Sequence, residues 1–429
     1  MVRRWNCVIL FVGFSLVTPA DANAGGFQIR SHSAAGFGMS LAGVAAGGRL
    51  SYSYWNPATL ADIDQFQLEG VASGVFPFIS LSPSVATNNL IGALGGAPSG
   101  RTEIGKNAIV PASYVALPVG DRLTFGLSIT SPFGLATKAP TSWAGQIYGR
   151  NSELLSINVN PMVAYRVSDS LSIGAGLQVQ YFRAHLTQAA GIAPQAPAAA
   201  MKADGLGVGF NLGVQVRPWE GGAIGVGYRS AIAHDLDGHL EAMGLRLPAT
   251  TRLITPDIVS VGMQQSVTSR FRVMGTVEWS NWSRLGIVPV YAANTSAVLT
   301  ALPLRYRDGW LFAIGGEYDL SQNLTVRSGF GYEIAPMNDV SRDARMPETN
   351  QFILSVGLSY SYSSQLSFDL SYTQSLGLGR GRVSIGPGDP RFLGVPFDAS
   401  SSLTVGILSV AAAYRFGGET VRSRPAIWK

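Results

Sequence analysis

The stretch LSIGAGLQVQY, residues 171–181, decides the fold of this chain. Apolar side chains stand at every second position, and Ser, Gly or Gln fills the positions between them. Successive side chains of a β-strand point to opposite faces, so one face of this strand is apolar and the other is polar. Such a strand fits a sheet with lipid on one side and a polar interior on the other.

The same alternation recurs along the chain and predicts about fourteen strands. The expected strands are 65–79, 107–118, 121–132, 153–167, 170–186, 205–218, 222–234, 252–267, 269–283, 304–319, 322–334, 350–363, 364–376 and 401–416. Short connections such as 168–169 alternate with long ones such as 235–251, 284–303 and 187–204, the last of which we expect to be mobile. An even strand number with short periplasmic turns and long outer loops is typical of bacterial outer-membrane barrels. The sequence therefore predicts an all-β fold, a transmembrane antiparallel β-barrel.

The composition supports a membrane barrel and disfavours several other classes of protein. Only 13% of the 429 residues are charged, and 51 are Gly. Soluble domains have about 25% charged residues. The single Cys excludes a disulfide scaffold, and four His leave little for a metal site. A net charge of +5 without a basic block disfavours nucleic acid as a partner. We expect no cofactor and no metal.

The first 24 residues have the features of a signal peptide. Two arginines precede a short apolar run at 8–17, and Ala22-Asn23-Ala24 supplies a small-residue cleavage site. The run of about ten residues is too short for a transmembrane helix, which needs about 20. We expect cleavage before Gly25, a mature chain without Cys7, and insertion in the outer membrane.

Residues 25–64 do not alternate and are rich in Gly and Ala. An unpaired backbone cannot lie in lipid, so this segment either hangs in the periplasm or fills the lumen. The interior of so wide a barrel is not filled by side chains alone, which favours a plug. The chain then divides into a signal peptide (1–24), an N-terminal hatch (25–64), a transmembrane barrel (65–416) and a C-terminal tail (417–429).

A series of short motifs follows one another along the mature chain. They are Gly26–Gln28, Ser33–Gly38, Asn56–Ala58, Thr130–Thr137, Trp143–Gly145, Asn160–Pro161, Glu278–Ser283, Tyr306–Trp310, Arg327–Glu333 and Met346–Glu348. In this order they resemble the FadL and TodX type of outer-membrane transporter for long-chain fatty acids and other hydrophobic compounds. The resemblance implies a fourteen-stranded, monomeric barrel plugged by a hatch, through which hydrophobic molecules pass without an energy source.

The resemblance also implies which residues control the opening. It places gating at Phe27 and at Asn56, Pro57 and Ala58, where the family's hatch meets a kinked strand beside a lateral exit. The kinked strand is expected around 121–132, with Gly126 as its weak point because Gly inside a strand often marks a bend. The stretch just before the Asn-Pro-Ala motif lacks the acidic residues common in family hatches, so its charge pattern differs.

A fatty acid needs an apolar slot and a cation for its carboxylate, whereas an aromatic hydrocarbon needs no cation. The apolar candidates, for which ordinary loop packing is the alternative, are Phe76, Phe78, Ile79, Phe133 and Leu135. The cationic candidates are Arg183, which matches a family position, Arg305 and Arg327. Arg183 shares the parity of Leu177 and Val179, which predicts that it faces outward. Inward charges such as Arg327 fit a wall network as well as a substrate contact.

The resemblance implies a passive transporter for hydrophobic compounds, first of all long-chain fatty acids, with hatch-gated lateral release. The alternatives are an aromatic-hydrocarbon channel of the same type, a general diffusion porin, and a structural or adhesin barrel. A porin leaves residues 25–64 without a role. An enzyme needs a nucleophile with a base, and none of the four His pairs obviously with an inner-wall Ser, so we expect no enzyme. The expected partners are a hydrophobic small molecule, the lipid bilayer and lipopolysaccharide.

Overall fold

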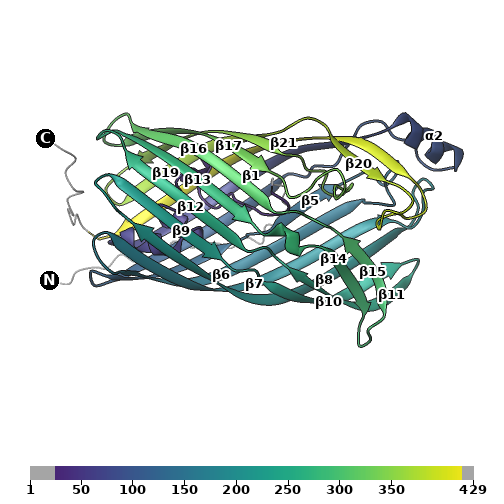
Figure 1. The fold of residues 1–429 in the computed structure, drawn as a ribbon, viewed down its shortest axis with the longest axis horizontal. Helices are drawn as coiled ribbons and strands as arrows, with labels where there is room; N and C mark the ends of the chain where they lie inside the picture. Colours follow the sequence, from purple (N-terminus) through teal and green to yellow (C-terminus); the bar gives the residue numbers. More distant parts are fainter. Residues whose placement is uncertain (1–24, 418–429) are drawn as a thin grey trace, which may run out of the picture.

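The computed structural model describes residues 25–417, so the expected signal peptide and most of the C-terminal tail lie outside the described residues. One sheet of tilted antiparallel strands is rolled into a barrel (Figure 1). The long wall strands are β1 (Phe66–Pro83), β3 (Ala108–Val119), β6 (Asn151–Arg166), β7 (Leu171–Ala189), β8 (Ala198–Val216), β17 (Leu324–Ile334), β18 (Gln351–Ser361), β19 (Leu366–Gly377) and β21 (Phe397–Phe416). In the described part of the chain, no helix is long and apolar enough to cross a membrane.

Five further wall positions consist of two strands each, because the chain leaves the ladder once on the way. They are β4 (Leu123–Thr130) with β5 (Gly134–Lys138), β9 (Gly222–Arg229) with β10 (Ala233–Ala242), β11 (Leu245–Ile254) with β12 (Ile258–Ser266), β13 (Phe271–Ser280) with β14 (Ile287–Ala292), and β15 (Val298–Pro303) with β16 (Gly309–Asp319). Together the wall has fourteen strand positions. The last closes onto the first, with Phe66 opposite Phe416 and Pro83 opposite Ala399. The predicted even-numbered barrel is confirmed.

The two faces of the wall follow the alternation of the sequence. In β18, Phe352, Leu354 and Val356 are exposed on the outer surface, whereas the alternate residues Gln351, Ile353 and Ser355 are buried in the lumen. The outer face carries apolar side chains around the barrel, which suits lipid contact. Gly and small polar residues dominate the inner face, and they leave room for a further layer of chain.

The two ends of the barrel differ in the length of their connections. Short turns such as 167–170 and 320–323 lie at the end of the barrel where β1 begins and β21 ends (Figure 1), which in bacterial barrels faces the periplasm. At the other end the chain forms the hairpins β10–β11 and β14–β15, where the sequence analysis expected loops. The expected loop 187–204 is also shortened, because β7 runs to Ala189 and β8 begins at Ala198. Strand pairing thus continues above the lipid, where no apolar face is needed to mark it. The outer connections also hold α2 (Val85–Ala93), β2 (Thr102–Glu103) and β20 (Gly381–Ile385).

The N-terminal segment, residues 25–64, lies inside the barrel and is almost wholly buried (Figure 1). It contains α1 (Ala34–Phe37), η1 (Leu50–Tyr54) and η2 (Pro57–Asp62). Ser33 starts α1 because its Oγ accepts from the Gly36 N–H at 3.2 Å. Asn56 starts η2 in the same way, and Pro57 follows at the first position, where no backbone donor is needed.

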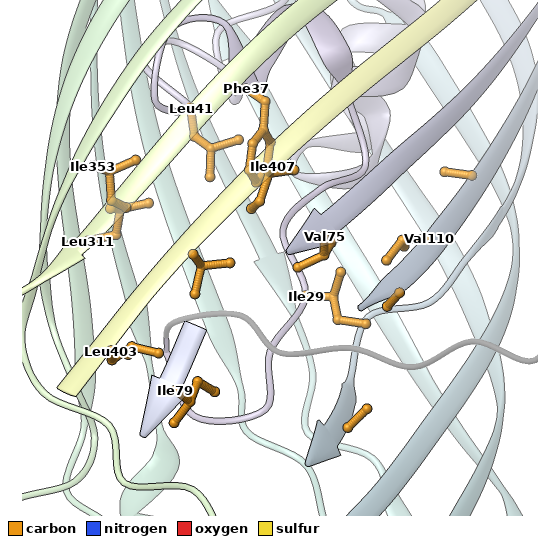
Figure 2. Packing of buried hydrophobic residues seen from close by; sticks show 14 of the residues in the cluster. Ile29, Phe37, Leu41, Val75, Ile79, Val110, Leu311, Ile353, Leu403 and Ile407 are labelled. Atoms are coloured by element: carbon orange, nitrogen blue, oxygen red, sulfur yellow. The ribbon is translucent and has the colours of Figure 1, made fainter. Parts of the chain in front are cut away.

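Apolar side chains of this segment pack on inward-facing residues of the wall. Figure 2 shows Ile29 beside Val75 and Val110, and Phe37 beside Ile407. All belong to one buried cluster that joins the segment to the wall strands. The lumen is therefore filled by chain and is not an open pore.

Candidate functional site

A second buried cluster, which we call the apolar cluster, surrounds Phe27 on the outer side of the lumen. Its larger members are Phe27, Phe133, Leu135, Phe182, Leu253, Trp282, Leu285, Tyr306, Met337 and Met346. The Phe27 ring lies edge-on to Trp282, with centroids 4.7 Å apart, and 6.0 Å from Phe133. Edge-to-face aromatic packing of this kind contributes about 0.5–1.5 kcal/mol per pair beyond burial. Phe27 therefore occupies the centre of an aromatic cage formed by the wall and the outer connections.

The wall is kinked next to this cluster, between β4 and β5. Residues 131–133 leave the ladder, and the N-terminal segment takes their place as a pairing partner. Ile29 N donates to Pro132 O and Gly134 N donates to Phe27 O, both at 2.8 Å. Phe133 N donates to Ser156 Oγ at 2.8 Å, which holds the Phe133 ring inside. Proline lacks an N–H, so a break in the ladder at this position loses one hydrogen bond fewer.

The kink leaves part of β3 paired on one edge only, within the described residues. β3 pairs with β1 over Ala108–Ala116, but with β4 only over Ser113–Val119. Beyond the kink, β5 pairs with β6 on one edge. On its other edge β5 makes a single isolated bridge, between Thr137 and Gly105. Residues 108–112 and the kink thus form a weak line in the wall, covered from inside by Ile29. The bend predicted at Gly126 is wrong, because the ladder runs unbroken through Gly126, whose Cα instead faces Leu60 of the N-terminal segment.

The lumen wall becomes polar one row below the apolar cluster. At the cluster, Ser156 of β6 stands opposite Phe182 of β7. The next inward-facing row toward the short-turn end has Asn158 of β6 between Gln180 of β7 and Thr130 of β4. Several buried polar side chains on these rows and on the N-terminal segment have no protein hydrogen-bond partner among residues 25–417. They include Ser31, Ser53, Ser128, Thr130, Asn158 and Ser172. Buried polar groups need hydrogen-bond partners, which a hydrocarbon cannot supply. The row at Thr130, Asn158 and Gln180 is therefore an unfavourable position for an apolar solute.

The Asn-Pro-Ala motif anchors the N-terminal segment to the wall. Asn56 Nδ2 donates to Ala45 O at 2.7 Å and to Val214 O of β8 at 3.0 Å. Gly174, Gly213 and Gly227 stand in register on three adjacent strands and face this motif. A Cβ at any of the three would collide with residues 55–58. The glycines thus allow the motif to lie directly on the wall backbone.

The structure brings together only some of the residues that the sequence analysis singled out. Phe27, Phe133 and Leu135 meet in the apolar cluster. Ile79 is buried elsewhere in the lumen, and Phe76 and Phe78 face outward, at 39% and 65% exposed.

The three candidate arginines lie in three different places. Arg183 is exposed on the outer face opposite Asp204, as its parity indicates. Arg327 is buried in a wall network with Glu317 and Asp369, at 3.3 and 3.1 Å. Arg305 is exposed between β15 and β16, next to Tyr306 of the apolar cluster.

Trp282, Phe182 and Tyr306 of the apolar cluster were missed as site residues. Trp282 and Tyr306 stand in motifs that carried the resemblance, so a signal existed for them. Phe182 is the inward neighbour of Arg183, and its parity alone marks it. Among residues 25–417, no group of three or more His, Cys, Asp or Glu has the arrangement of a metal site.

A charged cluster lies next to Phe27. Arg30 Nε donates to Glu278 Oε1 at 2.8 Å and Arg30 also pairs with Glu333. Glu348 accepts from the backbone N–H of Gly25 and of Gly26, the latter at 2.8 Å. These contacts fix both sides of the Phe27 backbone. Burial, with Glu333 close by, raises the pKa of Glu348, in the connection after β17, to about 8.

The chain matches known proteins along nearly its whole length. It matches the family described as outer membrane protein transport protein (OMPP1/FadL/TodX) over residues 15–416. It is 25% identical over 407 residues to the long-chain fatty acid transport protein of Escherichia coli O6:H1, covering 84% of this chain and 89% of that protein. It is 26% identical over 420 residues to outer membrane protein P1 of Haemophilus influenzae, covering 86% and 90%.

Solved structures show the same fold. A Pseudomonas aeruginosa FadL homologue matches with a TM-score of 0.81 at 22% identity, over 92% of this chain and 100% of that one. The Pseudomonas putida toluene transporter TodX matches with a TM-score of 0.67 at 17% identity, over 93% and 100%. The family is one of transport proteins and not of enzymes, and its members lie in the outer membrane. The chain belongs to the OMPP1/FadL/TodX family of outer-membrane transport proteins.

Proposed function

We propose that this chain carries hydrophobic compounds, first of all long-chain fatty acids, passively across the outer membrane and releases them sideways through the wall. The observation that carries the proposal is the position of the apolar cluster directly beside the kink at residues 131–133. An apolar solute in the cluster lies beside the kink, and residues 108–112, next to the kink and covered by Ile29, are paired on one edge only. Toward the short-turn end the solute meets the polar side chains of Thr130 and Asn158.

Residues 25–64 act as the hatch in this proposal. The segment fills the lumen, its Phe27 occupies the apolar cluster, and its backbone at Phe27 and Ile29 is paired to the kink. A solute that replaces the Phe27 ring disturbs the strand pairing that closes the wall. Binding and opening are thereby coupled through two hydrogen bonds. Asn56, Pro57 and Ala58 hold the rest of the hatch in place at the glycine row.

Arg305 is our candidate for the carboxylate of a fatty acid. It lies on the connection between β15 and β16, flanked by Leu304 and Tyr306, which pack in the apolar cluster. The carboxylate of Asp389 lies close enough to feel the charge of Arg305, but its ion pair is with Arg391, at 2.6 Å. A guanidinium at the rim of an apolar slot suits a solute with one charged end. The E. coli relative is named for long-chain fatty acids, which supports this substrate class.

An aromatic hydrocarbon is the second candidate, because the cage around Phe27 is largely aromatic and TodX, a toluene transporter, has the same fold. A general porin is disfavoured by the filled lumen.

The experiment measures uptake of oleate, toluene and glucose into liposomes that contain the refolded mature protein. We expect uptake of oleate without glucose. In Arg305→Gln we expect the half-saturating oleate concentration to rise about tenfold, since one charge-assisted hydrogen bond is worth about 1.5–3 kcal/mol, while toluene uptake is unchanged. Arg252→Gln, an exposed arginine in an outer hairpin, is the matched control. Toluene uptake without oleate uptake selects the aromatic alternative, and equal glucose flux refutes the proposal.

A further inference from the structure

Three carboxylates and one guanidinium are buried together around the first described residue, Gly25. Glu278 and Glu333 are each 1% exposed, Glu348 is 3% exposed and Arg30 is 5% exposed. Arg30 pairs with Glu278 and Glu333. The cluster therefore has more acidic than basic side chains in a place that water does not reach.

Glu333 has one carboxylate oxygen, Oε2, without a hydrogen-bond partner among residues 25–417, and Glu348 accepts hydrogen bonds from neutral donors. Glu348 is held by three neutral donors, the backbone N–H groups of Gly25 and Gly26 and the side-chain amide of Gln351 at 3.2 Å. An uncompensated buried carboxylate costs several kcal/mol. The arrangement calls for one more cation within reach of both Glu333 and Glu348.

Gly25 lies between these two carboxylates. Its nitrogen donates to Glu348 Oε1, and a Cβ on its α-carbon would lie 2.5 Å from Glu333 Oε1 and 2.6 Å from Arg30 Nη1. Gly25 and Gly26 also adopt φ of 100° and 70°, which favour glycine. The backbone is thus pressed between the two carboxylates, and nothing larger than glycine fits at residue 25.

We propose that Glu348 and Glu333 form a binding site for the α-ammonium group of Gly25 that signal-peptide cleavage creates. Hydrolysis of the Ala24–Gly25 bond by a signal peptidase consumes one water, leaves a carboxylate on Ala24 and leaves an amine on Gly25 that takes up a proton. The single N–H donor of the precursor becomes three donors with a full positive charge. One donor keeps the bond to Glu348, and a second is available to Glu333.

The proposed site makes seating of the hatch depend on processing. Gly25 and Gly26 lead directly to Phe27, so the ion pair positions the ring that occupies the apolar cluster. In an unprocessed chain the same carboxylates are buried with a neutral amide. The inference rests on the expected cleavage before Gly25 and does not depend on which compound the barrel carries.

The test uses the mature protein purified from outer membranes in detergent. N-terminal sequencing first establishes Gly25 as residue one; any other mature terminus overturns the proposal. The protein is then treated at pH 7 with an amine acylating reagent, and labelling is quantified by mass spectrometry. A free α-amino group, with a pKa of about 8, is over a hundredfold more deprotonated at pH 7 than an ordinary lysine, with a pKa of about 10.4. An unbound terminus is therefore labelled well before the lysines.

We expect the reverse order in the native protein, with Gly25 labelled more slowly than exposed Lys202. In Glu348→Gln, which keeps the shape of the side chain, we expect Gly25 labelling to rise about tenfold or more, because a charge-assisted bond is replaced by a weaker one. Glu103→Gln, in an exposed outer pair with Arg101, is the matched control and leaves labelling unchanged. If Glu348→Gln does not fold, Glu333→Gln serves the same purpose. Rapid labelling of Gly25 in the native protein overturns the proposal, whatever the uptake assays show.

Discussion

Gly213 of β8 faces the Asn-Pro-Ala motif so closely that a single methyl group tests how the N-terminal segment, the proposed hatch, is seated. A Cβ at residue 213 would collide with Asn56 Oδ1 and lie 2.8 Å from Pro57 Cδ. Asn56 is completely buried, and its amide is fixed by bonds to Ala45 O and Val214 O. Gly213→Ala therefore forces either the motif or the wall to move.

The cost follows from these contacts. Overpacking a filled interior costs about 1–3 kcal/mol, and each hydrogen bond that Asn56 loses adds about 1 kcal/mol. We expect seating of the hatch to weaken by about 2–4 kcal/mol, which raises the unseated population roughly 30- to 1000-fold. Conductance of single barrels in planar bilayers measures this population, because an unseated hatch admits ions. Gly213→Ala is expected to open more often and for longer than the native protein.

Two further variants make the result decisive. Gly70→Ala is the matched control, because Gly70 lies on the outer face of β1 and a Cβ there has nothing within 4 Å. The double variant Gly213→Ala with Asn56→Ala removes the oxygen that the methyl group meets, so the two effects are expected to be less than additive. If Gly213→Ala conducts like Gly70→Ala, or if the effects add fully, the glycine row does not seat the hatch and the reasoning fails.

Three other substitutions probe separate parts of the molecule. Phe27→Ala removes the ring at the centre of the apolar cluster and is expected to cost about 3–5 kcal/mol locally, seen as faster proteolysis of the N-terminal segment in folded barrels. Arg327→Ala removes one of two cationic partners from half-buried Glu317, which keeps Arg272, and from buried Asp369, which keeps Arg49. We expect it to lower the free energy of unfolding by about 1.5–3 kcal/mol, the worth of a charge-assisted hydrogen bond, measured by denaturant titration, whereas Arg252→Ala in an exposed pair changes it by under about 1 kcal/mol. Ser156→Ala removes the acceptor for Phe133 N and is expected to increase oleate uptake by loosening the kink; unchanged uptake counts against the proposed exit.

The barrel was predictable because lipid and lumen impose opposite polarity on neighbouring residues. β18 and β7 show the period of two along their membrane-spanning parts, and no other fold explains it so simply. The hairpins β10–β11 and β14–β15 escaped prediction because both of their faces lie outside the lipid. There, backbone pairing alone extends the strands, and the side chains need not alternate.

The kink shows how a local signal can have two meanings. Glycine weakens a strand and so predicts the bend at Gly126, yet here the missing side chain makes room for Leu60. The real break at residues 131–133 contains Pro132, whose missing N–H was visible in the sequence. The choice between the two depends on where the N-terminal segment lies in the lumen, which no local pattern contains. The aromatic cage has the same origin, because Phe182, Trp282 and Tyr306 come from separate parts of the barrel.

The polar row at Thr130 and Asn158 bears on the direction that an apolar solute takes in the proposed release. A chain with about 16 methylenes gains about 0.8 kcal/mol for each one that it buries, or roughly 13 kcal/mol in full. Movement toward the periplasm past Thr130 and Asn158 forfeits most of this gain, since these rows are polar. In the release that we propose, movement past residues 108–112 leads to an outer face on which apolar Ile109 is exposed. On this proposal the chain is expected to lose less burial on the sideways path than on a path past Thr130 and Asn158.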